Sequence, residues 1–394
     1  MKLITSEKVS IHKTYRILVI DLEPAPYKTD LWNVFSDSKE IELSVLYTER
    51  KNWSPDGGHN YLKWPISRHE NIVFEGRGIH GALQSAWVAA KKIFGNKSDL
   101  IYIAGYVHLS TVVALICSII LGKTFVMHAD EFNNSRPQGK FSGLKWVFRE
   151  LLRQWIFKYG RAVLVCGRRG AETALLAGCN EKKILNFPYV IDVERMKAES
   201  PEVVPQGCIG DLNEGSIVIF FSGRMIPRKG LPTLLEALSR MSTSKKWILW
   251  IEGDGPELGQ YKSVAQERGV QDRCRFLGFC QYDVHSWLVR SADIVVVPSL
   301  VDTWGIVVDE GIQLGKAVIS SDATGSGYDR IQNGHNGFIF PVADVVSLSN
   351  ILISLVEDEN QRALVGCMAM SGGGSIRPTD NRETLLKLIK DISK

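Results

Sequence analysis

The sequence predicts an α/β protein with two doubly wound parallel sheets. Short β-branched and aliphatic runs alternate with amphipathic stretches along the whole chain, which is typical of a parallel sheet with helices on both faces. The chain has 394 residues and is 45% hydrophobic, enough for two ordinary cores. We therefore expect a first domain over residues 1–205, a second domain over residues 206–375 and a C-terminal helix over residues 376–394 that crosses back to the first domain.

The first half of the chain has the pattern of strand, loop and helix. We expect strands at residues 15–21, 41–47, 72–75, 100–104, 124–128 and 162–166, and helices at residues 82–94, 110–121 and 144–159. The stretch 201–215, rich in proline, glycine and acidic residues, is the expected linker between the domains. In the second half we expect strands at residues 216–221, 247–252, 294–298 and 316–320, a helix at residues 231–241 and a flexible turn at residues 321–327.

Composition narrows the class of protein. The net charge is only +4, and we expect no nucleic-acid partner. The seven cysteines form no C-x-x-C pair, which favours reduced thiols and predicts no structural metal. The first residues lack the order of a signal peptide, and the apolar run at residues 111–121 is too short for a bilayer. We expect a cytoplasmic protein.

Two acidic residues stand out in the stretch 298–320. Asp302 comes just before an expected helix and Glu310 lies inside it. With Thr303 as the N-cap, the free amides at the start of this helix favour an anion such as phosphate, while Glu310 can accept hydrogen bonds from hydroxyl groups. Together these groups suit a nucleotide. The alternative is that Asp302 is a turn residue and Glu310 a solvated helix carboxylate.

A second stretch, Ser-Gly-Arg-Met-Ile-Pro-Arg-Lys-Gly at residues 222–230, follows the expected strand at 216–221. Its small residues, Gly223 among them, let the backbone approach a phosphate, and Arg224 and Lys229 bring two positive charges to the same place. A pair of cations alone is more often a solvated turn. The acidic stretch some 75 residues later favours the phosphate site.

These two stretches together resemble the GT-B retaining glycosyltransferases of the glycosyl transferases group 1 type (family 4). The resemblance rests on Pro-Ser, an acid, an aromatic-glycine pair, seven residues between the two acids and Gly-Lys-Ala-Val-Ile-Ser, and on Gly-Arg, four residues and Lys-Gly. The family usually has glutamate at the first acid, where this chain has Asp302. The resemblance implies two Rossmann-like domains that face one another across a cleft.

The resemblance also implies roles for individual residues. The donor is a nucleoside diphosphate sugar of the UDP or GDP type, and no metal or other cofactor is needed. Asp302 contacts the donor sugar and Glu310 the ribose, while Arg224 and Lys229 stabilise the leaving diphosphate. The nucleotide-binding residues are Gly223, Arg224, Lys229, Thr303, Trp304, Gly305, Ile306 and Glu310.

Two features of the first half remain open. His128 closes an expected strand at a position where the resembled family commonly has a sugar-contacting histidine, yet a lone histidine is more often structural. The expected helix at residues 144–159 mixes cations with aromatic residues, so that it suits either an anionic membrane or an ordinary domain surface. We expect the acceptor to be a glycan carried on a lipid, with peripheral attachment of the protein to the inner membrane face. Two other functions are compatible with the sequence: a GT-B nucleotide-sugar epimerase, or a non-catalytic nucleotide-binding subunit.

Overall fold

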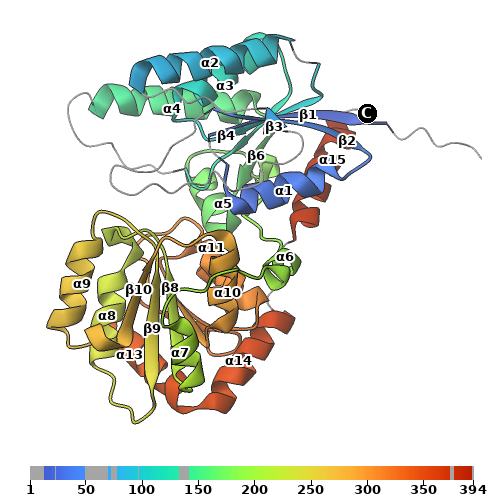
Figure 1. The fold of residues 1–394 in the computed structure, drawn as a ribbon. Coiled ribbons are helices and arrows are strands. Elements are labelled where there is room, and N and C mark those ends of the chain that lie inside the picture. Colours follow the sequence, from blue (N-terminus) through green and yellow to red (C-terminus); the bar gives the residue numbers. More distant parts are fainter. Residues whose placement is uncertain are drawn as a thin grey trace, which may run out of the picture.

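A computed structural model shows two α/β domains, each built on a parallel sheet (Figure 1). The structure describes residues 13–22, 24–48, 70–71, 78–95, 97–132, 142–372 and 377–392. Within these residues, the first sheet has seven strands in the order β3-β2-β1-β4-β5-β6-β7, and the second has six in the order β10-β9-β8-β11-β12-β13. This arrangement confirms the predicted doubly wound α/β class.

The strands of the first sheet are β1 (Tyr15–Asp21), β2 (Ile41–Tyr47), β3 (Glu70–Asn71), β4 (Leu100–Ala104), β5 (Phe125–His128), β6 (Ala162–Val165) and β7 (Ile184–Asn186). The helices around this sheet are α1 (Pro26–Ser36), α2 (Gly78–Gly95), α3 (Leu109–Ile120), α4 (Ser142–Tyr159) and α5 (Gly167–Leu176). The strand expected at residues 72–75 lies outside the described residues. The central strands are apolar and buried on both faces, as expected for a parallel sheet covered by helices.

The second sheet consists of β8 (Ile217–Ser222), β9 (Trp247–Glu252), β10 (Cys274–Gly278), β11 (Ile294–Val297), β12 (Ala317–Ser321) and β13 (Phe338–Phe340). Its helices are α8 (Leu231–Ser239), α9 (Leu258–Glu267), α10 (Tyr282–Ser291), α11 (Ile306–Gln313), α12 (Gly325–Arg330), α13 (Val345–Glu357) and α14 (Glu359–Gly372). One prediction here was wrong. The stretch 321–327 is not a flexible turn throughout, because α12 begins at Gly325.

The segments between the two domains are also ordered. Helix α6 (Val193–Ala198) has Asp192 as its N-cap, and the Asp192 side chain accepts a hydrogen bond from the Arg195 amide. The expected linker contains a helix, α7 (Cys208–Asn213), that packs on the second domain. The buried side chain of Asp211 accepts from Trp250 Nε1 at 2.9 Å and pairs with Arg275, so half of this stretch belongs to the second domain.

The last helix, α15 (Pro378–Ile392), lies against α1 in the first domain (Figure 1). Leu385 and Ile389 are buried in the same apolar cluster as Trp32 and Phe35 of α1. Asn381 donates to the carbonyl oxygen of Pro188 at 2.9 Å. The chain therefore crosses between the domains a second time, after α14.

Candidate active site

Two loops of the second domain meet at the carboxyl end of its sheet. The first loop follows β8 and ends in a short 3₁₀ helix (Pro227–Lys229), and the second follows β11 at Pro298. Gly230 has a φ of 69°, and a Cβ added there would lie 1.9 Å from the carbonyl oxygen of Pro298. The Leu300 amide donates to the Arg228 carbonyl oxygen at 2.7 Å. Glycine at position 230 thus permits the loop contact that brings the two predicted stretches together.

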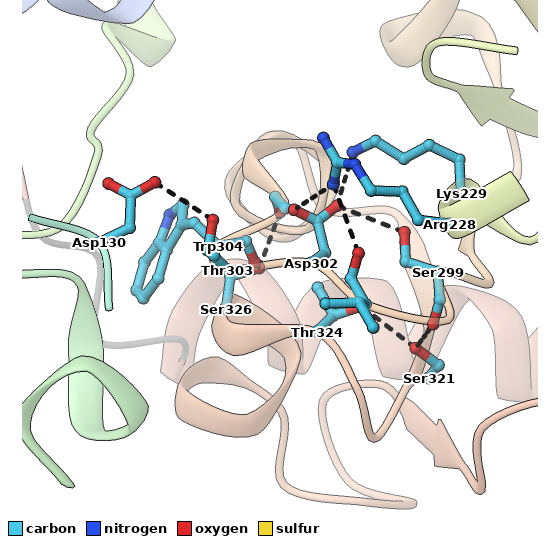
Figure 2. A network of polar contacts seen from close by, with 12 residues as sticks. Asp130, Arg228, Lys229, Ser299, Asp302, Thr303, Trp304, Ser321, Thr324 and Ser326 are labelled. Atoms are coloured by element: carbon cyan, nitrogen blue, oxygen red, sulfur yellow. Dashed lines mark hydrogen bonds and ion pairs between the residues drawn. The ribbon is translucent and has the colours of Figure 1, made fainter. Parts of the chain in front are cut away.

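Asp302 is the centre of this contact. Its Oδ2 atom lies 2.6 Å from Lys229 Nζ, and Oδ1 lies 3.8 Å from a guanidinium nitrogen of Arg228 (Figure 2). Ser299 donates to Oδ2 at 3.3 Å, and the Asp302 backbone is bridged to Thr324. Only 7% of Asp302 is exposed. The carboxylate is therefore fixed in place and faces two cations.

The helix that follows does not begin at Thr303, as the sequence suggested. Its first residue is Ile306 and its N-cap is Gly305, which has a φ of 81°. A Cβ at Gly305 would lie 2.5 Å from Thr324 Cγ2. The Thr303 hydroxyl instead donates to Asp130 Oδ2 of the first domain at 3.2 Å (Figure 2). The prediction of a threonine cap was wrong because Thr303 makes a contact between the domains.

Trp304 has a buried side chain in this loop. Its Nε1 donates to Asp309 Oδ2 at 2.7 Å, and Asp309 also pairs with Arg330 Nε at 2.9 Å. Burial raises the pKa of Asp309 to about 6, although Arg330 and the Trp304 hydrogen bond act in the opposite direction. The indole therefore holds the loop to helix α11. In this arrangement, it is the backbone of residues 304–306 that can meet a ligand, since the first amides of a helix lack intrahelical acceptors.

Glu310 lies in α11 and is only 4% exposed. The helix packs tightly on the sheet because the next residue is Gly311, where a Cβ would lie 2.7 Å from Val318 Cγ2. Glu310 Oε2 is 3.0 Å from His285 Nε2, and Glu252 Oε2 is 2.6 Å from His285 Nδ1. Burial alone would lower the pKa of His285, but the charges and hydrogen bonds of the two glutamates raise it well above its usual value. Glu310 is therefore held by a buried histidine.

The loop with Gly223 and Arg224 packs against the Gly-Asp-Gly turn at residues 253–255. Both glycines of this turn have positive φ values, and a Cβ at Gly253 would lie 1.9 Å from the Gly223 carbonyl oxygen. Asp254 accepts from the Gly255 amide at 2.7 Å, so it stabilises the turn. Arg224 is exposed on the loop above. This turn thus supports the loop that carries Arg224.

His128 ends β5 on the opposite side of the domain contact. It is buried, with Nδ1 2.5 Å from the Tyr102 hydroxyl and Nε2 3.5 Å from Cys166 Sγ. Burial lowers the pKa of His128, so the ring is neutral near pH 7. Tyr189 donates to Asp130 Oδ1 at 2.6 Å. An adjoining cavity of about 20 Å³ has room for one water and none for a sugar ring.

Among the residues that the structure describes, His128, Asp130 and Cys166 form a group that could hold a metal ion. Their possible ligand atoms lie within 4.8 Å of one another. Each of the three side chains has hydrogen-bond partners in the structure, among them Tyr102, Tyr189 and Thr303. The expectation that the protein needs no metal stays a prediction.

Residues 209–366 match the family model of glycosyl transferases group 1. This part of the chain is therefore similar to the glycosyl transferases group 1 domain. The lipopolysaccharide core biosynthesis glycosyltransferase LpsE of Rhizobium meliloti is 29% identical over 173 residues, which cover 44% of this chain and 46% of that protein. A phosphatidyl-myo-inositol mannosyltransferase of Mycolicibacterium smegmatis is 31% identical over 155 residues, 38% of each chain. These matches span less than half of the curated relatives.

The fold of nearly all of the chain is similar to that of a solved structure. The crystal structure of Anabaena HepE in complex with UDP and glucose covers 96% of this chain and 100% of its own, with a TM-score of 0.75 and 18% identity. At that identity the likeness concerns the fold. It confirms the expected GT-B arrangement of two Rossmann-like domains.

The structure brings together most of the residues that the sequence singled out. Lys229, Asp302 and the start of α11 lie side by side, and Glu310 lies further along the same helix. Thr303 is turned toward the domain contact, Trp304 is hydrogen-bonded to Asp309 of α11, and His128 lies on the other side of the contact with Asp130. Sequence reasoning missed several residues that contact these side chains directly: His285, Arg228, Ser299, Asp309 and Asp130. It also missed Glu252, which contacts His285.

Proposed function

We propose that this protein is a retaining glycosyltransferase that moves a sugar from a UDP- or GDP-type donor to a hydroxyl acceptor without a metal ion. The contact between Lys229 and Asp302, beside the start of α11, is the observation that carries this proposal. It combines a cation and free helix amides for a diphosphate with a carboxylate for sugar hydroxyls. Ligands of doubly wound sheets bind at this end of the strands.

The charges suit the departure of a diphosphate. As the bond to the sugar breaks, negative charge grows on the leaving phosphate, and Lys229, Arg224 and the amides of residues 304–306 would stabilise it. Lys229 is paired with Asp302 before a donor is present. A bound diphosphate would share this cation, and Asp302 would then accept from a sugar hydroxyl. Glu310 would accept from the ribose.

Incubation of the purified protein with UDP-glucose or GDP-mannose, with and without a bacterial lipid extract, tests the reaction. We expect free nucleoside diphosphate to appear only when the extract is present. Isomerised donor without acceptor would instead identify an epimerase. Release of neither product, with nucleotide binding intact, would identify a non-catalytic subunit.

We further propose a lipid-linked glycan acceptor and peripheral attachment through α4. The names of the relatives, a lipopolysaccharide core enzyme and a phosphatidyl-inositol mannosyltransferase, support such an acceptor. Helix α4 lies at the end of the first domain far from the second (Figure 1). Among the described helices, none has both the length and the apolar content to cross a bilayer.

Helix α4 has an apolar stripe on its outer face. Leu152 and Ile156 are buried, but other large apolar side chains three or four positions apart are 41–71% exposed: Leu144, Val147, Phe148, Leu151, Trp155 and Tyr159. Contiguous exposed apolar residues on a helix suit a partner surface, and Lys145 and Lys158 beside them favour an anionic one. Arg153, another cation of this helix, has a side chain only 12% exposed and pairs with Glu150.

Sedimentation with phosphatidylglycerol vesicles tests this attachment. We expect binding at low salt that falls as salt screens the charges, and loss of binding in a Leu151→Ser/Trp155→Ser variant. Leu364→Ser on α14, where Leu364 is 57% exposed, is the matched control and should bind normally. Equal sedimentation of the double variant and the control would exclude α4 as the membrane-binding helix.

A further inference from the structure

His285 lies between two buried carboxylates from different elements. Glu252 ends β9 and faces Nδ1 at 2.6 Å, while Glu310 of α11 faces Nε2 at 3.0 Å. Glu252 is 5% exposed and Glu310 is 4% exposed. The imidazole therefore connects the carboxyl end of β9 to the helix whose start lies beside Lys229 and Asp302.

Both ring nitrogens of His285 face a carboxylate oxygen. Carboxylate oxygens only accept hydrogen bonds, so two ionised glutamates require an imidazole with a proton on each nitrogen. The Glu252 and Glu310 charges raise the pKa of His285 well above its usual value, against the effect of burial, which is consistent with such a ring. The rings of Tyr282, from the same helix, and Phe220, from β8, cover the imidazole, each with its centroid 6.1 Å away.

Glu310 has a second oxygen that this contact leaves available. Within the described part of the chain, the Glu310 side chain makes its hydrogen bond through Oε2, to His285. With Oε2 fixed, rotation of the carboxylate is restricted and Oε1 points in one direction. A buried carboxylate with one anchored oxygen is a preorganised acceptor for hydroxyl groups.

We propose that His285 is a positioning residue of the nucleotide site, which holds Oε2 of Glu310 so that Oε1 accepts from the ribose hydroxyls of a nucleoside diphosphate. This assignment rests on the proposed function, because it needs a ribonucleotide beside Glu310. Glu252 anchors the other side of the imidazole and keeps Nε2 directed at α11. The pair of His285 and Glu252 then makes the site selective for nucleotides that carry ribose hydroxyls.

The test compares UDP with 2′,3′-dideoxy-UDP in calorimetry, and repeats the comparison with the two guanosine analogues. We expect the wild-type chain to bind UDP or GDP, whichever it binds more tightly, with an affinity about tenfold or more above that for the dideoxy analogue, as expected for a hydrogen bond to a charged group. In His285→Gln the amide nitrogen replaces Nε2 and still reaches Glu310, so most of the preference should remain. In His285→Asn the amide replaces Nδ1 and reaches only Glu252, so the preference should fall to about onefold. The exposed His335→Asn is the matched control and should behave as wild type.

The outcomes separate this assignment from the function on which it rests. If the ribose preference survives His285→Asn, or if His285→Gln and His285→Asn lose it equally, the role of His285 is overturned and the proposed function is not. A wild-type chain that binds neither UDP nor GDP would overturn the proposed function and this assignment with it. If His285→Asn does not fold, nitrogen NMR of the wild type decides, because a His285 Nε2 that carries no proton cannot donate to Glu310 and would also overturn the proposal.

Discussion

Removing the charge of Lys229 should lower both stability and activity, and a second substitution should separate the two effects. In Lys229→Met the side chain keeps its length, but Asp302 loses a partner at 2.6 Å while its own side chain is only 8% exposed. Breaking a fully buried pair in this way costs about 3–5 kcal/mol. Because the Lys229 side chain is 20% exposed and Arg228 remains 3.8 Å away, we expect a loss of about 2 kcal/mol, below that range for a fully buried pair.

The double variant Lys229→Met/Asp302→Asn removes the unpaired charge. We expect it to recover most of the lost free energy of unfolding, while turnover stays roughly 10² to 10³ below wild type because the cation for the leaving group is absent. Denaturant unfolding and release of nucleoside diphosphate measure the two effects separately.

Lys246→Met is the matched control, because Lys246 pairs with Glu214 at 3.9 Å and both side chains are about 70% exposed. Its stability should change by no more than about 0.5 kcal/mol. The reasoning fails if Lys229→Met is as stable as this control, or if it keeps near-normal turnover.

Three further predictions concern the same domain. Glu310→Gln should weaken nucleotide binding about tenfold in calorimetry, since a neutral amide is a poorer acceptor for hydroxyl groups, and it should also lower the free energy of unfolding, because His285 loses a buried charged partner. Unchanged affinity would exclude the ribose contact. Gly230→Ala should lower the free energy of unfolding by more than about 1 kcal/mol, because Gly230 has a positive φ and lies close to the Pro298 carbonyl oxygen. The control Gly259→Ala, in helix α9 with open space around it, should not destabilise the protein. The pKa of His285 is raised on folding, so the contribution of His285 to the free energy of unfolding is full below about pH 6.5 and is lost as the pH rises through the pKa of the folded state. A pH series in which His285→Gln and wild type lose stability in parallel would contradict this.

Most of the predicted strands match the observed ones to within a residue, although β7 was not predicted and the strand expected at residues 72–75 lies outside the described residues. Strands β1, β2, β4 and β9 have the predicted bounds, because each is a short apolar run bounded by polar or turn-forming residues. A buried parallel strand can be recognised from its own apolar residues, without knowledge of its partners in the fold. The class of fold followed from their alternation with helices.

Contacts between distant segments could not be predicted in the same way. Threonine is a common N-cap residue, yet the Thr303 hydroxyl donates a hydrogen bond to Asp130 of the other domain, and the helix starts three residues later. Gly325 and Gly327 suggested a flexible turn, but they lie in the first turn of helix α12. A Cβ at Gly325 would lie 2.1 Å from the Thr303 carbonyl oxygen, and one at Gly327 would lie 2.4 Å from Ser320 Oγ. Close packing explains these glycines.

His285 illustrates the same limit within the site. Nothing in the spacing of residues 282–291 distinguishes it from a surface histidine of an ordinary helix. Its two partners lie on β9 and α11, and only the order of strands in the sheet brings them to either side of the ring. Lys229 and Asp302, in contrast, belong to stretches that could be paired from the sequence.

Helix α15 has a consequence for how this chain folds during its synthesis. The apolar cluster around Trp32 and Phe35 is completed by Leu385, Leu386 and Ile389, which are made after the whole second domain. While the ribosome is still translating the second domain, the side of α1 that meets α15 is open to water. Nascent chains should therefore need protection from aggregation until residue 392 has left the ribosome, and premature termination before Pro378 should leave a folded second domain beside an incomplete first one.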